Sequence, residues 1–123
     1  MRLPFTDLLQ FNNLNKNRVN HFMIQKCNNA TQILHRGKMR RVCEWLVDNG
    51  FYFVNEAKFK TGGRADIVTN FMPFSEEGKI GSVIEIVNTE KETSLLKKAK
   101  MYPKCLRLII VKAETRFKEE LLK

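Results

Sequence analysis

Residues 80–88 read IGSVIEIVN, a nearly continuous apolar run that is interrupted by one acid, Glu85. Short runs rich in isoleucine and valine are typical of strands. A run without polar alternation indicates a strand that is buried on both faces of a sheet. The sequence therefore predicts a central strand at 80–88 that carries a carboxylate in its middle.

Two further strands are predicted before this central strand. Residues 51–57 are aromatic and β-branched, and residues 64–70 read RADIVTN. The pair Gly62-Gly63 between them is a turn signal. We therefore expect these two strands to be antiparallel neighbours in one sheet.

Helices are predicted on either side of the strands. Residues 31–49 have apolar positions at helical spacing, and residues 90–101 have helical composition and end before Pro103. The second helix can make a right-handed crossover to a parallel strand at 106–112. A short charged helix at 114–123 is expected to follow. The predicted fold is α/β, with a mixed sheet of about four strands flanked by helices.

The first thirty residues differ from the rest of the chain. They are rich in asparagine and only weakly patterned, so residues 1–30 are predicted to form a helical arm or appendage on the core or on a second subunit. Residues 31–123 are then one α/β domain. No apolar run approaches the ~18 residues of a membrane span, and the N-terminus does not resemble a signal peptide. We therefore expect an intracellular, cytoplasmic protein without a membrane partner.

The three cysteines, Cys27, Cys43 and Cys105, form no C-x-x-C pair. An odd and scattered set of thiols argues against a disulfide framework and against a structural zinc site. We expect these residues to be thiols that pack as small apolar side chains.

The chain carries a net charge of +9, from 22 Lys and Arg against 13 Asp and Glu. A field of this strength usually serves a polyanionic partner, and nucleic acid is the expected one. Two basic groups are candidates for straddling a phosphate backbone, and the alternative for each is a solvated face. They are Arg36, Lys38, Arg40 and Arg41 on the first long helix, and Lys97, Lys98, Lys100 and Lys104 around the end of the second.

Two acids lie inside apolar strands. Asp66 stands in the run ADIV and Glu85 in the run VIEIV. A carboxylate in such a place is costly unless a partner or a metal compensates it. Two carboxylates that converge from consecutive strands, with backbone carbonyls nearby, provide the oxygen ligands that Mg²⁺ prefers. Such a site can stabilise a phosphate during displacement by water.

With these residues the chain resembles the PD-(D/E)xK, or restriction-endonuclease-like, nuclease superfamily. The predicted order of helix, three strands, helix and strand is similar to the core of that superfamily, over roughly residues 31 to 111. In this resemblance Asp66 of GGRADIV is the Asp of the second core strand, and Glu85 of VIEIVN is the acid of the third. The resemblance implies metal-dependent hydrolysis of phosphodiester bonds in DNA. It also implies that Mg²⁺ or Mn²⁺ is held by Asp66, Glu85 and the carbonyl of Ile86.

The resemblance implies auxiliary roles for three more residues. Arg64, two positions before the Asp, fits a common variant of the motif. His35 and Glu44 fall where RecB-like members often carry an auxiliary His or Glu. They are nine residues apart on one helix, about two and a half turns, so both cannot face one metal. The alternatives are a surface position for His35 and a boundary ion pair for Glu44.

One position departs from the family pattern. The family lysine should follow the acid by two residues, and Val87 stands there. One hypothesis is that a lysine from another element replaces it, with Lys60 favoured over Lys91 and with Lys38 a further candidate. The other hypothesis is that the domain has lost catalysis and is a non-catalytic nucleic-acid-binding or assembly protein.

Two further expectations concern partners. A homodimer is expected for a nuclease that cuts both strands with one small site per chain. The remote alternative for the whole chain is a basic protein-interaction domain without a nucleic-acid partner.

Overall fold

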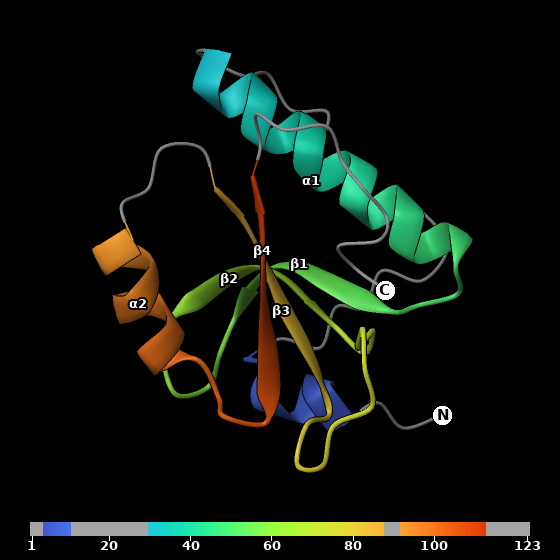
Figure 1. The fold of residues 1–123 in the computed structure, drawn as a ribbon, viewed down its shortest axis with the longest axis vertical. Helices are drawn as coiled ribbons and strands as arrows, with labels where there is room; N and C mark the ends of the chain where they lie inside the picture. The colour runs from blue at the N-terminus through green and yellow to red at the C-terminus, as the bar shows by residue number, and fades with distance from the viewer. Residues whose placement is uncertain (1–3, 11–29, 88–91, 113–123) are drawn as a thin grey trace.

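The computed structural model describes residues 4–10, 30–87 and 92–112. They form a four-stranded sheet in the order β1-β2-β3-β4, with helices on both faces (Figure 1). The predicted mixed α/β fold is confirmed, and the element boundaries differ from the predicted ones by no more than one or two residues. The elements are η1 (Pro4–Leu8), α1 (Ala30–Asp48), β1 (Phe53–Lys58), β2 (Arg64–Thr69), β3 (Gly81–Val87), α2 (Glu92–Met101) and β4 (Leu106–Lys112).

The strand pairing follows the predicted directions. β1 and β2 are antiparallel, and Gly62 and Gly63 turn the chain between them at φ values of 98° and 87°, which favour glycine. β3 and β4 are parallel along their full length. β2 and β3 are antiparallel over three pairs only, from Thr69–Ser82 to Ile67–Ile84.

One glycine fixes how closely β3 approaches β2. A Cβ atom on Gly81 would lie 2.4 Å from the carbonyl oxygen of Thr69. No other residue fits there without moving the backbone, so Gly81 sets the start of the central strand.

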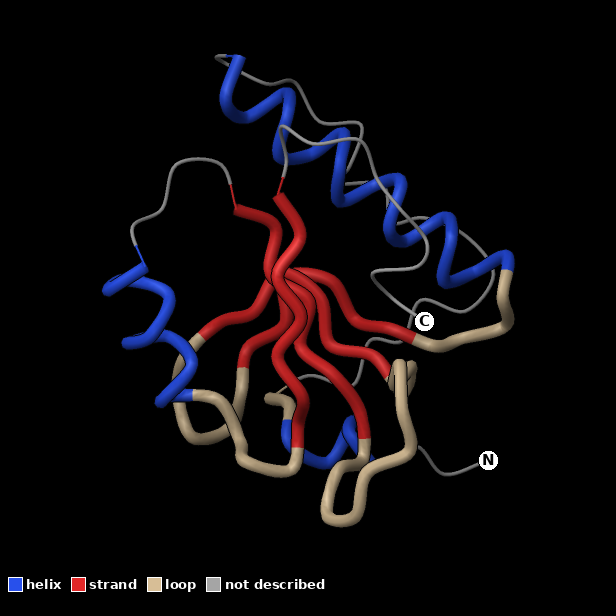
Figure 2. Tube along the Cα trace, viewed as in Figure 1, coloured by secondary structure: helices blue, strands red, loops and turns tan. Residues whose placement is uncertain are grey.

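Apolar side chains form a core on each face of the sheet. On one face α1 packs Val42, Trp45 and Leu46 against Ile67 and Ile84 of the central strands. On the other face η1 and Tyr102, just after α2, cover a second cluster. Figure 2 shows the strands fanning out between these layers, so the sheet is covered on both sides near its centre.

The short helix η1 belongs to the second core. Phe5 and Leu9 are buried, and the backbone of Leu8 and Gln10 bonds to Lys60 and Lys58 beside the hairpin. Residues 4–10 therefore pack on the core beside the β1–β2 hairpin. The rest of that arm, the predicted C-terminal helix and Cys27 lie outside the described residues. Among the described helices, none has the length and apolar character needed to cross a membrane.

Candidate metal and nucleic-acid site

The ladder between β2 and β3 stops immediately before the two acids. Ile67–Ile84 is the last pair, and Asp66 and Glu85 are the next residue on each strand. Beyond this point the backbone N–H of Ile86 donates to Oδ2 of Asp66 at 2.8 Å. A side-chain carboxylate thus takes over the acceptor role of the strand backbone, and this places Asp66 between β2 and β3.

The strand face changes at the same place. Ala65 and Ile67 are two residues apart, yet they pack on opposite faces of the sheet. Across the hairpin Glu56 has a φ of 48°, which is uncommon for a residue with a side chain. Both strands are therefore irregular at this level. Strained backbone that persists in a fold often marks a functional site.

Asp66 is held by two donors. His35 of α1 places Nε2 at 3.3 Å from Oδ2 of Asp66, and the Ile86 N–H approaches the same oxygen. Burial raises the pKa of Asp66, but the hydrogen bonds from His35 and Ile86 outweigh it and the pKa lies below its ordinary value. The same hydrogen bond raises the pKa of His35, against the effect of its burial. Asp66 is therefore the ionised member of the acidic pair.

Glu85 is the member of the pair with the raised pKa, and it carries a proton below about pH 7. Burial and the negative charge of Asp66 raise its pKa to about 7. The hydroxyl of Tyr102 donates to Oε1 of Glu85. That hydrogen bond and the positive charge of Lys98 lower the pKa, but less than burial and Asp66 raise it. Two carboxyl groups with opposite shifts in one place are typical of a site that binds a cation or transfers protons.

Both acids open into one cavity of about 380 Å³. Its other walls come from Gly63, Arg64, Lys98, Met101 and Tyr102, at the hairpin turn and on α2. The cavity therefore brings two carboxylates and a lysine ammonium group together at the level where β2 and β3 part. This combination can hold a divalent cation beside a phosphate.

Lys98 was not among the lysines predicted to replace the missing motif lysine. Lys60 is exposed and does not line the cavity, and Lys91 lies outside the described residues. Lys38 is only 4% exposed on α1 and is not a cavity wall either. The motif position, Val87, is buried. Of the described lysines, Lys98 is the one that lines the cavity with the two acids, and the predicted Lys60 lies outside it.

The three predicted auxiliary residues have different places. His35 is half-buried and faces Asp66. Arg64 lines the cavity, and its carbonyl lies 3.4 Å from the Tyr102 hydroxyl. Glu44 is exposed and accepts a hydrogen bond from Arg40 one turn away, at 2.9 Å. The predicted half-turn separation of His35 and Glu44 on α1 accounts for this division.

The predicted basic groups are mostly on the surface. Arg40, Arg41, Lys97, Lys100 and Lys104 are exposed, and Arg36 is half-buried. Lys38 differs from the others, because only 4% of its surface is exposed and it is not part of this basic surface.

Two site residues, Lys98 and Tyr102, carry roles that the sequence did not assign. Lys98 lies in the last turn of α2 and Tyr102 directly follows its end, and both line the cavity of the two acids. Both interact with Glu85 of β3: Tyr102 donates a hydrogen bond to its carboxyl group, and the charge of Lys98 lowers its pKa. The available signal in the sequence was that both residues stand at the end of the predicted helix, shortly before Pro103.

Comparisons with protein-family models, curated proteins and solved structures found no significant match. Across residues 4–10, 30–87 and 92–112, no group of three or more His, Cys, Asp and Glu side chains has the arrangement of a metal centre. The candidate site is thus defined by a pair of carboxylates, its hydrogen-bond partners and one lysine.

Proposed function

We propose that this chain is a metal-dependent nuclease that hydrolyses phosphodiester bonds in DNA, on a restriction-endonuclease-like core. The observation that carries the proposal is the shared cavity of Asp66, Glu85 and Lys98 where β2 and β3 separate. The order of one helix, three strands, one helix and one strand supports it, since the two acids stand on the second and third strands. The net charge of +9 suits a polyanionic substrate.

The donors present fit Mg²⁺ or Mn²⁺. Mg²⁺ is usually held by one or two carboxylates and completes its shell with water and substrate phosphate, so the pair Asp66 and Glu85 suffices. The backbone of Ile86 lies beside Asp66 through its N–H, and its carbonyl is the third expected ligand. Bound there, a divalent cation supplies Lewis-acid stabilisation of a phosphate and lowers the pKa of water.

The chain's own residues have distinct roles in this reaction. His35 and the Ile86 N–H hold the Asp66 carboxylate, and Tyr102 holds that of Glu85. Lys98 faces the phosphate and balances the negative charge that develops as water adds to phosphorus and the P–O bond to the leaving group breaks. The ammonium group of Lys98 thus serves in place of a lysine at Val87.

The second candidate is a non-catalytic nucleic-acid-binding or assembly protein on the same fold. Val87 favours it, because the position two residues after Glu85 holds an apolar side chain. The two candidates differ in one measurable property. Both bind DNA, but only the nuclease consumes it when a divalent cation is added.

Cleavage of a supercoiled plasmid in Mg²⁺ or Mn²⁺ tests the proposal. We expect the wild-type chain to nick the plasmid, EDTA to stop it, and Asp66→Asn to lower the rate by at least about 100-fold, because the ionised carboxylate is lost. Asp48→Asn, at the exposed end of α1, is the matched control and should cleave like the wild type. Wild-type DNA binding without any cleavage would favour the second candidate, and full activity of Asp66→Asn would remove the acidic pair from the mechanism.

A further inference from the structure

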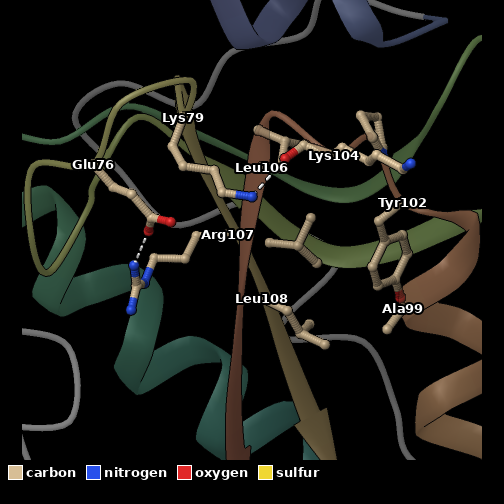
Figure 3. A pocket seen from close by; sticks show the side chains of 10 residues that line it. Glu76, Lys79, Ala99, Tyr102, Lys104, Leu106, Arg107 and Leu108 are labelled. Carbon is tan, nitrogen blue, oxygen red and sulfur yellow. Dashed lines mark hydrogen bonds and ion pairs between the residues drawn. The ribbon is translucent and has the colours of Figure 1, made fainter.

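A second cavity lies on the other side of Tyr102 from the acidic one. It is an open groove of about 530 Å³ at the beginning of β4. Leu106 and Leu108 lie along its middle, between the loop that precedes β3 and the end of α2 (Figure 3). Tyr102 lines both cavities, so the groove and the acidic site are neighbours under one helix.

The charged walls of this groove are mainly basic. Lys79, Lys104 and Arg107 stand against a single acid, Glu76. Arg107 donates to Glu76, and Nζ of Lys79 donates to the backbone carbonyl of Lys104 at 2.6 Å, as the dashed lines of Figure 3 mark. The Lys79 contact fixes an ammonium group at the mouth without neutralising it, because its partner is a neutral carbonyl.

An exposed aromatic ring lies beside Arg107, one of the residues that line the groove. Phe74 is 58% exposed, and the guanidinium carbon of Arg107 lies 4.7 Å from the centre of its ring. The ring and the guanidinium group together present two flat surfaces to solvent. Aromatic rings and arginine planes are the surfaces on which nucleobases stack, while lysines and arginines contact the phosphates between them.

We propose that this groove binds a phosphate of a nucleic-acid strand and that Phe74 stacks on an adjacent base. The proposal rests on the nuclease function, because the strand that occupies the groove is the one that passes Tyr102 into the acidic cavity. Glu76 acts as an internal competitor, since it occupies Arg107 until a phosphate replaces it. Neither Lys79, Arg107 nor Phe74 stands in the two basic groups recognised from the sequence.

Two substitutions that should change DNA affinity in opposite directions test the groove proposal. Binding of a fluorescein-labelled single-stranded oligonucleotide is measured by anisotropy in EDTA, so that cleavage plays no part. We expect Arg107→Gln to weaken binding by about 5-fold and to lower the salt slope by about one, as the loss of one phosphate contact requires. Glu76→Gln should instead tighten binding by about 3-fold, since it removes the competing carboxylate. The control is Lys58→Gln, an exposed charge on β1, which should change affinity by less than either.

An oligonucleotide without bases separates the two parts of the groove. We expect Phe74→Ala to weaken binding of the normal strand by about 5-fold but to leave the abasic strand unaffected. The groove proposal is overturned if Glu76→Gln and Arg107→Gln shift affinity in the same direction, or by no more than Lys58→Gln does. It is also overturned if polyglutamate of equal charge competes as well as the oligonucleotide, because the groove would then suit an acidic protein.

The outcome is independent of the cleavage assay. If the variants change affinity as expected but the wild type does not cleave DNA with metal, the groove proposal stands and the nuclease proposal fails. If the wild type cleaves DNA with metal but the variants leave affinity unchanged, the nuclease proposal stands and the groove proposal fails.

Discussion

Lys98→Met should lower metal-dependent cleavage by at least about 100-fold while the chain still binds DNA and Mn²⁺. The reason is that a preformed cation beside the reacting phosphate stabilises charge in the transition state, and loss of one such donor usually costs about 100- to 1,000-fold. Methionine keeps much of the length of the lysine side chain without its charge. The readout is the single-turnover rate under saturating metal and protein.

Lys100→Met is the matched control for this variant. Lys100 lies on the same helix but is exposed and does not line the acidic cavity. We expect it to lower the rate only slightly, through weaker binding. Equal rates for Lys98→Met and the wild type would exclude Lys98 as the replacement for the missing motif lysine.

Glu85→Gln should stabilise the metal-free protein at alkaline pH by up to roughly 3 kcal/mol. The pKa of Glu85 is about 7 in the folded chain against 4.5 ordinarily, so the unfolded chain releases this proton first as the pH rises. The free energy of unfolding therefore falls between about pH 4.5 and pH 7, by about 1.4 kcal/mol for each pKa unit of difference. Glutamine stays neutral, so the variant lacks this decrease.

Urea denaturation at pH 4 and pH 8 measures this effect. The two proteins should be nearly equal at pH 4, where Glu85 is protonated in both states, and should differ at pH 8. The raised pKa of His35 also lowers stability as pH rises, but it does so in both proteins. Glu44→Gln, which removes an exposed carboxylate, should follow the wild-type pH dependence. A stability difference that stays constant with pH would show that Glu85 is not the buried, protonated acid described above.

The sheet was predictable because local signals agree with the global packing. The Gly62-Gly63 pair, the apolar run around Glu85 and Pro103 each mark one boundary or pairing, and the structure has all of them. The two acids lie near one another because the antiparallel register of β2 and β3 places them at the same level of the sheet.

Which lysine lines the cavity of the two acids was less accessible to sequence reasoning. Lys97, Lys98 and Lys100 stand together in the sequence, and only the rotation of α2 on the sheet decides that Lys98 faces the acids. That rotation is set by tertiary packing. Lys60 is nearer to Asp66 along the chain, but the hairpin turn directs it to solvent. The basic groove could not be predicted for a similar reason. Lys79 and Arg107 are distant in sequence, and only the fold brings them to one groove at the beginning of β4.

The central claim is that Asp66 and Glu85 together hold a divalent cation, and crystals soaked in Mn²⁺ test it directly. The soak belongs at pH 8, where Glu85 has lost its proton and the metal does not have to displace it. The account predicts an anomalous difference peak within about 2.2 Å of an oxygen of each carboxylate, and no such peak in Asp66→Asn crystals treated alike. A saturating soak that leaves this position empty in the wild type, or an equal peak in the variant, would contradict it.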